Sequence, residues 1–323
     1  MYSKEEISQA EAVDIVDYCN QNGISLKKNS ERFYRLIDHD SCVLDRRKNC
    51  FHWNSRGVSG NVITFIRVYE EVNFKVAMEK LIGGKNDYES STNVEYVHEP
   101  YEYNPNNEVE SFDKAREYLT NERKIDPSIV EDLYEKGLIK QDKRNNVLFL
   151  WKDYEHIMGC SEQGTVKTSR YKRGSWKSIQ KNSTPNYGFN VIYGQPKNLK
   201  FFESSIDLLS YATLHKENLQ NTHLISMDGL SHEIVKKYIT TAIEKLNDAP
   251  DSISICVDND KAGQEFVEVY NHMEIRKKDG NTYDVTIDLP PVESGKDWND
   301  QLKMVAGKRE KQLQYQQYKG LER

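Results

Sequence analysis

Short apolar runs alternate with helical patterns between residues 199 and 290, and this alternation limits the folds that the chain can adopt. Four runs have the length and composition of strands, namely LKFFE, THLISM, SISICVD and YDVTIDLP. The segments between them, SIDLLSYATLHK, HEIVKKYITTAIEKL and AGQEFVEVYNHM, are typical of helices. Strands that alternate with helices of this length form βαβ units. We therefore predict an α/β domain with a central, largely parallel sheet.

The chain before this domain has the mixed signals of α+β domains. The first segment contains a predicted helix around residues 10–20, strands near 33–37 and 50–53, and helical patterns from Val62 and Phe74. It ends near Gly83. A polar stretch follows, and then Asp126-Pro127 opens a further helix before the strand-like runs VLFLW and HIMGC. The predicted divisions are residues 1–84, a linker over 85–110, a basic α+β subdomain over 111–195, the α/β domain over 196–302 and a tail over 303–323.

The cysteine count and the absence of long apolar segments indicate the cellular compartment. The five cysteines are odd in number and scattered, which argues against a disulfide framework and favours reduced thiols. No window approaches eighteen consecutive apolar residues, and residues 1–10 lack the profile of a secretory signal. We expect a cytoplasmic protein with no membrane partner.

The net charge of −6 does not by itself suggest a nucleic-acid partner. The distribution of charge is more informative, because no Asp or Glu occurs between Gln163 and Phe202. This segment is a local basic region, although the alternative interpretation as a solvated surface stays open. The positively charged residues within it are Lys167, Arg170, Lys172, Arg173, Lys177, Lys181, Lys197 and Lys200.

Carboxylates follow the predicted strands. Glu203 ends LKFFE, Asp258 and Asp260 follow SISIC, and Asp297 comes after the last strand and a loop. The carboxyl ends of parallel strands meet at one edge of a sheet, and acids gathered there need a cation or raised pKa values to offset their repulsion. Mg²⁺ or Mn²⁺ with oxygen ligands fits such a site. Asp207 lies one helical turn after Glu203. The alternative is that these acids cap the following helices.

Three pieces resemble a known family. FFESSIDLLS, CVDNDKAG and GKDWND are similar to the Glu, Asp-x-Asp and trailing Asp motifs of the Toprim domain, which occurs in bacterial primases, topoisomerases and some nucleases. The resemblance implies that Glu203 is a general acid/base and, with Asp258 and Asp260, catalytic. It also implies that the metal ligands are Glu203, Asp207, Asp258, Asp260 and Asp297.

The resemblance extends upstream. AREYLTNERKIDPSIVEDLYEKGLI and the basic stretch after it are similar in order to the amino-terminal half of a bacterial primase core. This implies that single-stranded DNA template and nucleoside triphosphates bind there, with Tyr171 and Trp176 available to stack on bases. The implied nucleic-acid- and nucleotide-binding residues are Lys167, Arg170, Lys172, Arg173, Lys177 and Lys181.

The first segment resembles a primase zinc-binding domain that has lost its ligands. FHWNSRGVSGNVITFIR matches the family's Gly-rich turn, but of the four ligand positions of the pattern only His39 is kept, and Leu36, Trp53 and Arg56 stand at the others. Because a tetrahedral site needs four N or S ligands, we expect no zinc. The arrangement resembles DUF3991/Toprim proteins of plasmids and transposons.

Three functions remain open at this point. The first is Mg²⁺-dependent nucleotidyl transfer, that is primer synthesis, in replication or transfer of a plasmid or other mobile element. The second is a Toprim nuclease, which uses the same metal site with water as nucleophile. The third is a non-catalytic DNA-binding accessory of conjugation or mobilisation. A helicase or relaxase of the mobile element is the protein partner that this setting implies.

Overall fold

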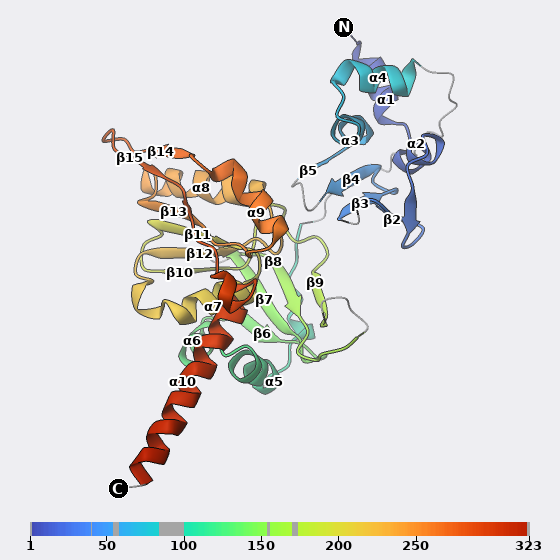
Figure 1. The fold of residues 1–323 in the computed structure, drawn as a ribbon. Coiled ribbons are helices and arrows are strands. Elements are labelled where there is room, and N and C mark those ends of the chain that lie inside the picture. Colours follow the sequence, from blue (N-terminus) through green and yellow to red (C-terminus); the bar gives the residue numbers. More distant parts are fainter. Residues whose placement is uncertain are drawn as a thin grey trace. The chain divides into compact units, whose positions relative to one another are not determined.

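The computed structural model describes residues 2–39, 41–53, 58–83, 100–153, 156–169 and 174–321. Contacts divide the chain into two compact units, residues 1–98 and 99–323 (Figure 1). Within the described ranges, none of the helices combines the length and apolar content needed to cross a bilayer.

The first unit packs four helices with a five-stranded antiparallel sheet in the order β1-β2-β3-β4-β5. Burial alternates along β2, which is typical of a sheet with one face on a core. Phe51, Trp53 and Phe65 fill that core. The elements are α1 (Lys4–Glu11), α2 (Ile15–Gln21), β1 (Leu26–Lys28), β2 (Phe33–Leu36), β3 (Cys42–Asp45), β4 (Cys50–Trp53), β5 (Val58–Gly60), α3 (Val62–Tyr69) and α4 (Phe74–Ile82).

One buried side chain fixes the junction between α1 and α2. Asn49 has a left-handed backbone, with φ of 49°. Its side-chain amide accepts from the N–H of Ile15 at 2.8 Å and donates to the carbonyls of Glu11 and Val13 at 2.9 and 2.8 Å. Asp14 then caps α2. The single helix predicted over residues 10–20 is therefore wrong, because the chain turns between two helices.

Apolar side chains occupy two of the positions that the resemblance assigns to zinc ligands. Leu36 and Trp53 are 1% and 2% exposed, respectively, and belong to the core of the unit. The ring of His39 packs on the indole of Trp53, with centroids 4.9 Å apart. Arg56 lies outside the described residues.

The second unit begins with helices and a four-stranded antiparallel sheet in the order β6-β7-β8-β9. The described part of the predicted linker packs on this sheet, since Tyr101 and Tyr103 contact the cluster of Leu148, Leu150 and Cys160. The elements are a 3-10 turn (Pro105–Asn107), α5 (Asp113–Glu117), a π-helical turn (Tyr118–Glu122), α6 (Pro127–Glu135), β6 (Ile139–Gln141), β7 (Val147–Asp153), β8 (His156–Gln163) and β9 (Lys177–Ile179).

The rest of the second unit is the predicted α/β domain. Its sheet has the order β10-β12-β11-β13-β16, in which β10 is antiparallel and the remaining pairs are parallel. The elements are β10 (Asn190–Tyr193), β11 (Asn198–Phe202), α7 (Ser205–Leu214), β12 (Thr222–Ser226), α8 (His232–Leu246), β13 (Ser252–Ile255), α9 (Lys261–Val267), β14 (Glu274–Arg276), β15 (Thr282–Asp284), β16 (Thr286–Ile287) and α10 (Trp298–Leu321), with 3-10 turns at Lys216–Asn218, Glu268–Tyr270 and Val292–Ser294.

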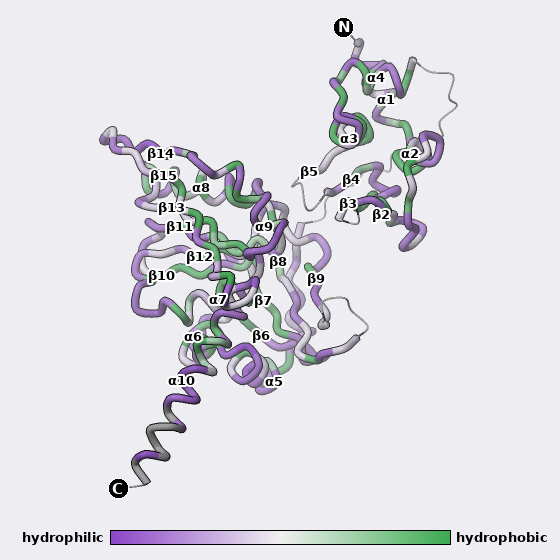
Figure 2. The backbone as a smooth tube through the Cα atoms, in the orientation of Figure 1, coloured by the Kyte–Doolittle hydropathy of each residue, from purple (hydrophilic) through white to green (hydrophobic). Residues whose placement is uncertain are grey.

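Both faces of this sheet are covered. Residues of α7 and the first turns of α10 join one core with Phe202 and Leu224, and residues of α8 and α9 join another with Phe201 and Ile253. Figure 2 shows the apolar stretches of the central strands inside the unit and a hydrophilic β14–β15 hairpin. Burial on both faces explains the near-continuous apolar runs seen in the sequence.

Two predicted elements at the end of the domain differ from the structure. The strand expected over residues 283–290 is split, because β15 pairs with β14 in a hairpin and only β16 joins the main sheet. The helix expected over residues 262–273 ends at Val267 and continues as a short 3-10 turn.

Replacement of Asn49 by Ala tests the α1–α2 junction. The substitution removes the partner of two buried backbone groups, those of Ile15 and Val13, and of the part-buried carbonyl of Glu11. The local stability of the first unit should therefore fall by about 2–4 kcal/mol. Hydrogen exchange of peptides covering α1 and α2 in the full chain measures this change. Asn20→Ala, at an exposed position of α2, is the matched control, and equal exchange in the two variants would contradict the assignment.

Candidate metal site and anion pocket

Three parallel strands deliver acidic residues to one edge of the α/β sheet. In the strand register Phe202 pairs with Ser226, and Phe201 pairs with Ile255. Glu203, Asp228 and Asp258 follow these strand ends within one to three residues. The carboxyl edge of the sheet therefore gathers acids from β11, β12 and β13, as the sequence predicts for Glu203 and Asp258.

A fourth acid reaches this edge from the loop before α10. Trp298 is 2% exposed, and its indole N–H donates to the carbonyl of Cys256 at 2.9 Å. The N–H of Asn259 donates to the carbonyl of Lys296 at 2.7 Å. These two contacts fix Asp297 beside the loop that carries Asp258.

Asp258 lies at the centre of the acidic group. Its side chain is 7% exposed, and its buried Oδ1 has no hydrogen-bond partner among the described residues. Burial, followed by the negative charges of Asp207, Glu203 and Asp297, raises the pKa of Asp258 to about 9. An unpartnered buried carboxylate oxygen surrounded by three further acids suits a hard cation such as Mg²⁺.

Asp207 faces the same space from the first turn of α7. Burial and the charge of Asp297 raise the pKa of Asp207 to about 6, while a hydrogen bond from the hydroxyl of Ser204 at 2.5 Å works in the opposite direction. The charge of Asp207 in turn contributes to the raised pKa of Asp258, so these two acids face each other across the site.

Asp260 uses one of its two carboxylate oxygens as a helix cap. Its Oδ1 accepts from the N–H of Gly263 at 3.1 Å, which caps α9. The strand β13 ends at Ile255, and Asp260 has an extended backbone as the N-cap of α9. In the described part of the chain, no three His, Cys, Asp or Glu side chains are already close enough to hold one ion. The acids thus surround a common space without converging on a single point.

The predicted basic residues divide into three groups. Lys177, on β9, lowers the pKa of both Asp207 and Asp228 through its positive charge, which places it on the side of the acidic site. Lys167 lines a pocket beside this site, whereas Lys181 is exposed and does not line it. The remaining predictions lie outside the described residues, namely Arg170, Tyr171, Lys172 and Arg173.

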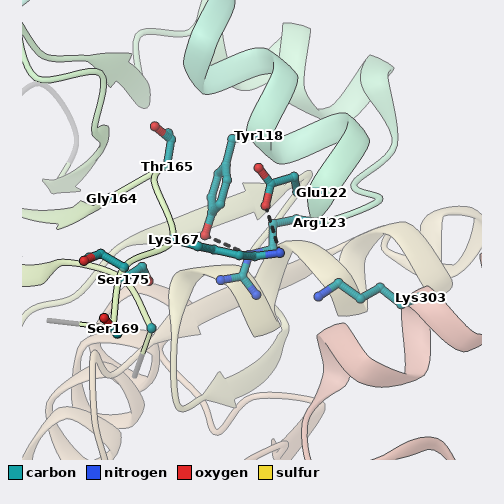
Figure 3. Close-up of a pocket in the computed structure, with 11 residues that line it drawn as sticks. Tyr118, Glu122, Arg123, Gly164, Thr165, Lys167, Ser169, Ser175 and Lys303 are labelled. Atoms are coloured by element: carbon teal, nitrogen blue, oxygen red, sulfur yellow. Dashed lines mark hydrogen bonds and ion pairs between the residues drawn. The ribbon is translucent and has the colours of Figure 1, made fainter. Parts of the chain in front are cut away.

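The pocket that contains Lys167 has a volume of about 480 Å³ (Figure 3). Its walls are the π-helical turn after α5, the loop between β8 and β9, and α10. Arg123, Lys167 and Lys303 supply three positive charges, and Glu122 pairs with Lys167 at 3.3 Å. The excess of positive charge and the hydroxyls of Ser169 and Ser175 suit an anion such as phosphate.

Sequence reasoning did not single out Arg123 or Lys303. The guanidinium of Arg123 donates to the phenol oxygen of Tyr118 at 2.8 Å and to the side-chain oxygen of Asn299 at 3.1 Å. Burial and the positive charge of Arg123 lower the pKa of Lys303. Only the folded arrangement reveals this pocket, because Arg123 and Asn299 are 176 residues apart in the chain. Asp228 was missed as well, and burial raises its pKa.

Comparisons with known families match the second unit. The family described as "Protein of unknown function (DUF3991)" matches residues 117–195. The family described as "Toprim-like" matches residues 201–302. An uncharacterized protein of Bacillus anthracis is 55% identical over 334 aligned positions, which cover 100% of this chain and 97% of that protein.

Solved primase structures show a more distant similarity. The zinc-binding and RNA polymerase domains of the Aquifex aeolicus primase are 17% identical, with a TM-score of 0.35, over 97% of this chain and 85% of that chain. The primase fragment of the bacteriophage T7 primase-helicase protein is 16% identical, with a TM-score of 0.39, over 60% and 72%. At these TM-scores the similarity carries no functional argument.

The raised pKa of Asp258 predicts how stability depends on pH. The folded state keeps a proton that the unfolded state loses near pH 4, so in EDTA the free energy of unfolding should fall as pH rises from about 4 towards 9. The slope from this one group should reach up to ~1.4 kcal/mol per pH unit. Urea unfolding of the second unit at several pH values measures it.

Asp258→Asn should flatten this dependence, because the amide carries no charge at any of these pH values. Asp284→Asn, at an exposed position of β15, is the matched control and should keep the slope of the wild type. A slope that is unchanged in Asp258→Asn would contradict the assignment of the charge to this site.

Proposed function

The chain belongs to the family of the Bacillus anthracis protein and is a Toprim primase-like protein, and from this membership we propose that it catalyses Mg²⁺-dependent nucleotidyl transfer on a DNA template. The reaction would be primer synthesis, with single-stranded DNA and nucleoside triphosphates as substrates. The setting proposed from the resemblance is replication or transfer of a plasmid or other mobile element, with a helicase or relaxase as partner.

The buried carboxylate of Asp258 is the observation that carries this proposal. Its Oδ1 has no hydrogen-bond partner among the described residues, and burial together with three neighbouring acids raises its pKa to about 9. A carboxylate in such a position is costly unless a proton or a cation offsets it. Glu203, Asp207, Asp258 and Asp297 are the residues that would hold Mg²⁺ or Mn²⁺, and the free oxygen of Asp260 is available from the cap of α9. A bound ion would supply Lewis-acid stabilisation of phosphoryl oxygens.

The chain's own residues have separate roles in the proposed reaction. Glu203 accepts the proton of the attacking 3′-hydroxyl, since it follows β11 at the rim of the acidic group. Arg123, Lys167 and Lys303 hold the triphosphate in the neighbouring pocket, where their charges also stabilise the leaving diphosphate. Lys177 lies near the acidic group, where its positive charge acts on Asp207 and Asp228.

The template would run along the face that carries β8 and β9. Of these two strands, β9 belongs to the acid-free stretch from Gln163 to Phe202, in which Lys167, Lys177 and Lys181 are described and positively charged, whereas β8 carries Glu162. Contacts to phosphate from such residues give an affinity that does not depend on base sequence and that weakens as salt is raised. Binding of this kind leaves base pairing to select the nucleotide that is added.

Primer synthesis by the purified full-length protein is the direct test. Incubation with single-stranded DNA, Mg²⁺ and labelled nucleotides should give short oligonucleotides, and Asp258→Ala should lower the rate by at least ~100-fold because the site loses its central acid. Asp284→Ala should retain the rate of the wild type. Omission of the divalent cation should abolish the product in all variants.

Two outcomes would replace the proposal. Cleavage of the labelled strand without nucleotides, lost in Asp258→Ala, would identify a nuclease. Salt-sensitive DNA binding with no turnover and no calorimetric signal for Mg²⁺ or Mn²⁺ would identify a DNA-binding accessory.

The role of the anion pocket can be tested apart from catalysis. Lys303→Ala should weaken the binding of a non-hydrolysable nucleoside triphosphate on the order of tenfold, as expected for one hydrogen bond to a charged group. Lys308→Ala, on an exposed position of α10, removes the same charge outside the pocket and should change the affinity little. Equal affinities for the two variants would exclude the pocket as the triphosphate site.

A further inference from the structure

A second pocket lies in the α/β domain, away from the carboxyl edge of the sheet. It has a volume of about 290 Å³ and is bounded by α8, by the edge strand β10 and by the ends of α6 and β7. None of the acidic residues assigned to the metal site lines it. Its size is at the lower end for small-molecule sites, so it fits one compact ligand.

The floor of this pocket is a fixed network of buried polar groups. The Nδ2 of Asn190 donates to the carbonyls of Lys152 and Gly188, both at 3.0 Å. Since these contacts fix the orientation of the amide, its Oδ1 is the acceptor for Nε2 of His223 at 3.0 Å. His223 is 8% exposed, and burial lowers its pKa to about 3, so the ring is neutral.

The tautomer of His223 follows from this network. Nε2 carries the hydrogen that it donates to Asn190, and Nδ1 is therefore an acceptor. A neutral acceptor on the lining of a pocket is matched by an N–H donor of a ligand, such as the amino group of a nucleic-acid base.

The rim of the pocket is positively charged. Lys136, Lys152, Lys237 and Lys245 line it, against one acid, Asp153. Lys136 pairs with Asp132 at 2.7 Å and Lys245 lies 3.8 Å from Asp153. Among the described residues, Lys152 and Lys237 form no ion pair with a carboxylate. Lys152 donates to the carbonyl of Lys136, and the ammonium of Lys237 lies 5.4 Å from the ring centroid of Tyr187.

Aromatic rings complete the walls. Tyr187 and Tyr238 lie with ring centroids 6.2 Å apart at an interplanar angle of 74°. The hydroxyl of Tyr238 is already used by the carbonyl of Gly188 at 3.2 Å, which holds the ring in place. Flat rings of this kind offer stacking surface to a base, and the neighbouring ammonium groups offer partners to a phosphate.

We propose that this pocket binds a nucleoside monophosphate group, with the phosphate at Lys152 and Lys237 and the base between Tyr187 and His223. The site is separate from the proposed catalytic centre and does not require its metal. The group can come from two sources, a free mononucleotide or the 5′-phosphorylated terminal nucleotide of a strand. In either case the nucleotide would lie against the face of α8 that carries Lys237 and Tyr238, whereas the exposed Lys236 does not line the pocket.

Calorimetric titration of the full-length protein in EDTA tests this proposal. The probes are AMP, inorganic phosphate, and a hexadeoxyadenylate with or without a 5′-phosphate. Lys152→Ala and Lys237→Ala should each weaken the binding of the effective probe on the order of tenfold. Lys236→Ala removes the same charge from a position of α8 that does not line the pocket, and it should change the affinity by less than about twofold.

The remaining comparisons separate this pocket from the proposed triphosphate site and identify the source of the ligand. Lys303→Ala should retain the binding measured in EDTA, because Lys303 lines the other pocket. Binding of AMP supports a free nucleotide, and binding confined to the 5′-phosphorylated strand supports a strand end. The proposal would be overturned if neither AMP nor the 5′-phosphorylated strand bound at millimolar concentration, or if inorganic phosphate bound as tightly as they do. It would also be overturned if Lys303→Ala abolished the binding while Lys237→Ala retained it. None of these results depends on whether primers are made.

Discussion

The hydrogen bond from the indole of Trp298 to the carbonyl of Cys256 holds the functional parts of the second unit together. On one side of this contact are β13 and the loop with Asp258, and on the other are Asp297 and the start of α10. Because α10 is anchored here, Lys303 is placed near Arg123, and Asn299 receives the hydrogen bond of that guanidinium. The acidic site and the anion pocket are therefore not independent features. They share one helix start, and loss of that anchor would displace groups in both.

The second unit has a group of acids at the sheet edge and, beside it, a separate group of cations in the anion pocket. At the sheet edge, burial and the neighbouring acids raise the pKa of Asp258, while Arg123, Lys167 and Lys303 line one pocket with a single acid, Glu122. Each arrangement is unfavourable alone, and each is offset by a ligand of the other sign. A metal-bound polyphosphate carries both signs, and it can satisfy the two regions simultaneously. A protein with a net negative charge thus has a local excess of positive charge beside a group of acids.

The sequence was sufficient for the parts of the structure that depend on local patterns. The alternation of strands and helices predicted the parallel sheet, and the strand ends predicted where Glu203 and Asp258 gather. It failed where a distant residue decides the local geometry. Asn49 breaks the predicted first helix from 34 residues away. The cap that Asp260 provides for α9 is a local contact, and it was one of the alternatives that the sequence left open. The anion pocket could not be predicted, because its three cations come from elements that are separated by most of the unit.

The contact between Trp298 and Cys256 also has a consequence for synthesis of the protein on the ribosome. The strands β11, β12 and β13 emerge first and can begin to pair, but Trp298, which comes directly after the acid that completes their edge, follows 42 residues after Cys256. Until that segment leaves the exit tunnel, the nascent domain has an open edge with three acids and no α10 against its core. Domains generally fold as units during translation. The last step of folding would therefore also be the step that creates the chemistry, and incomplete chains would be unable to act on nucleic acid.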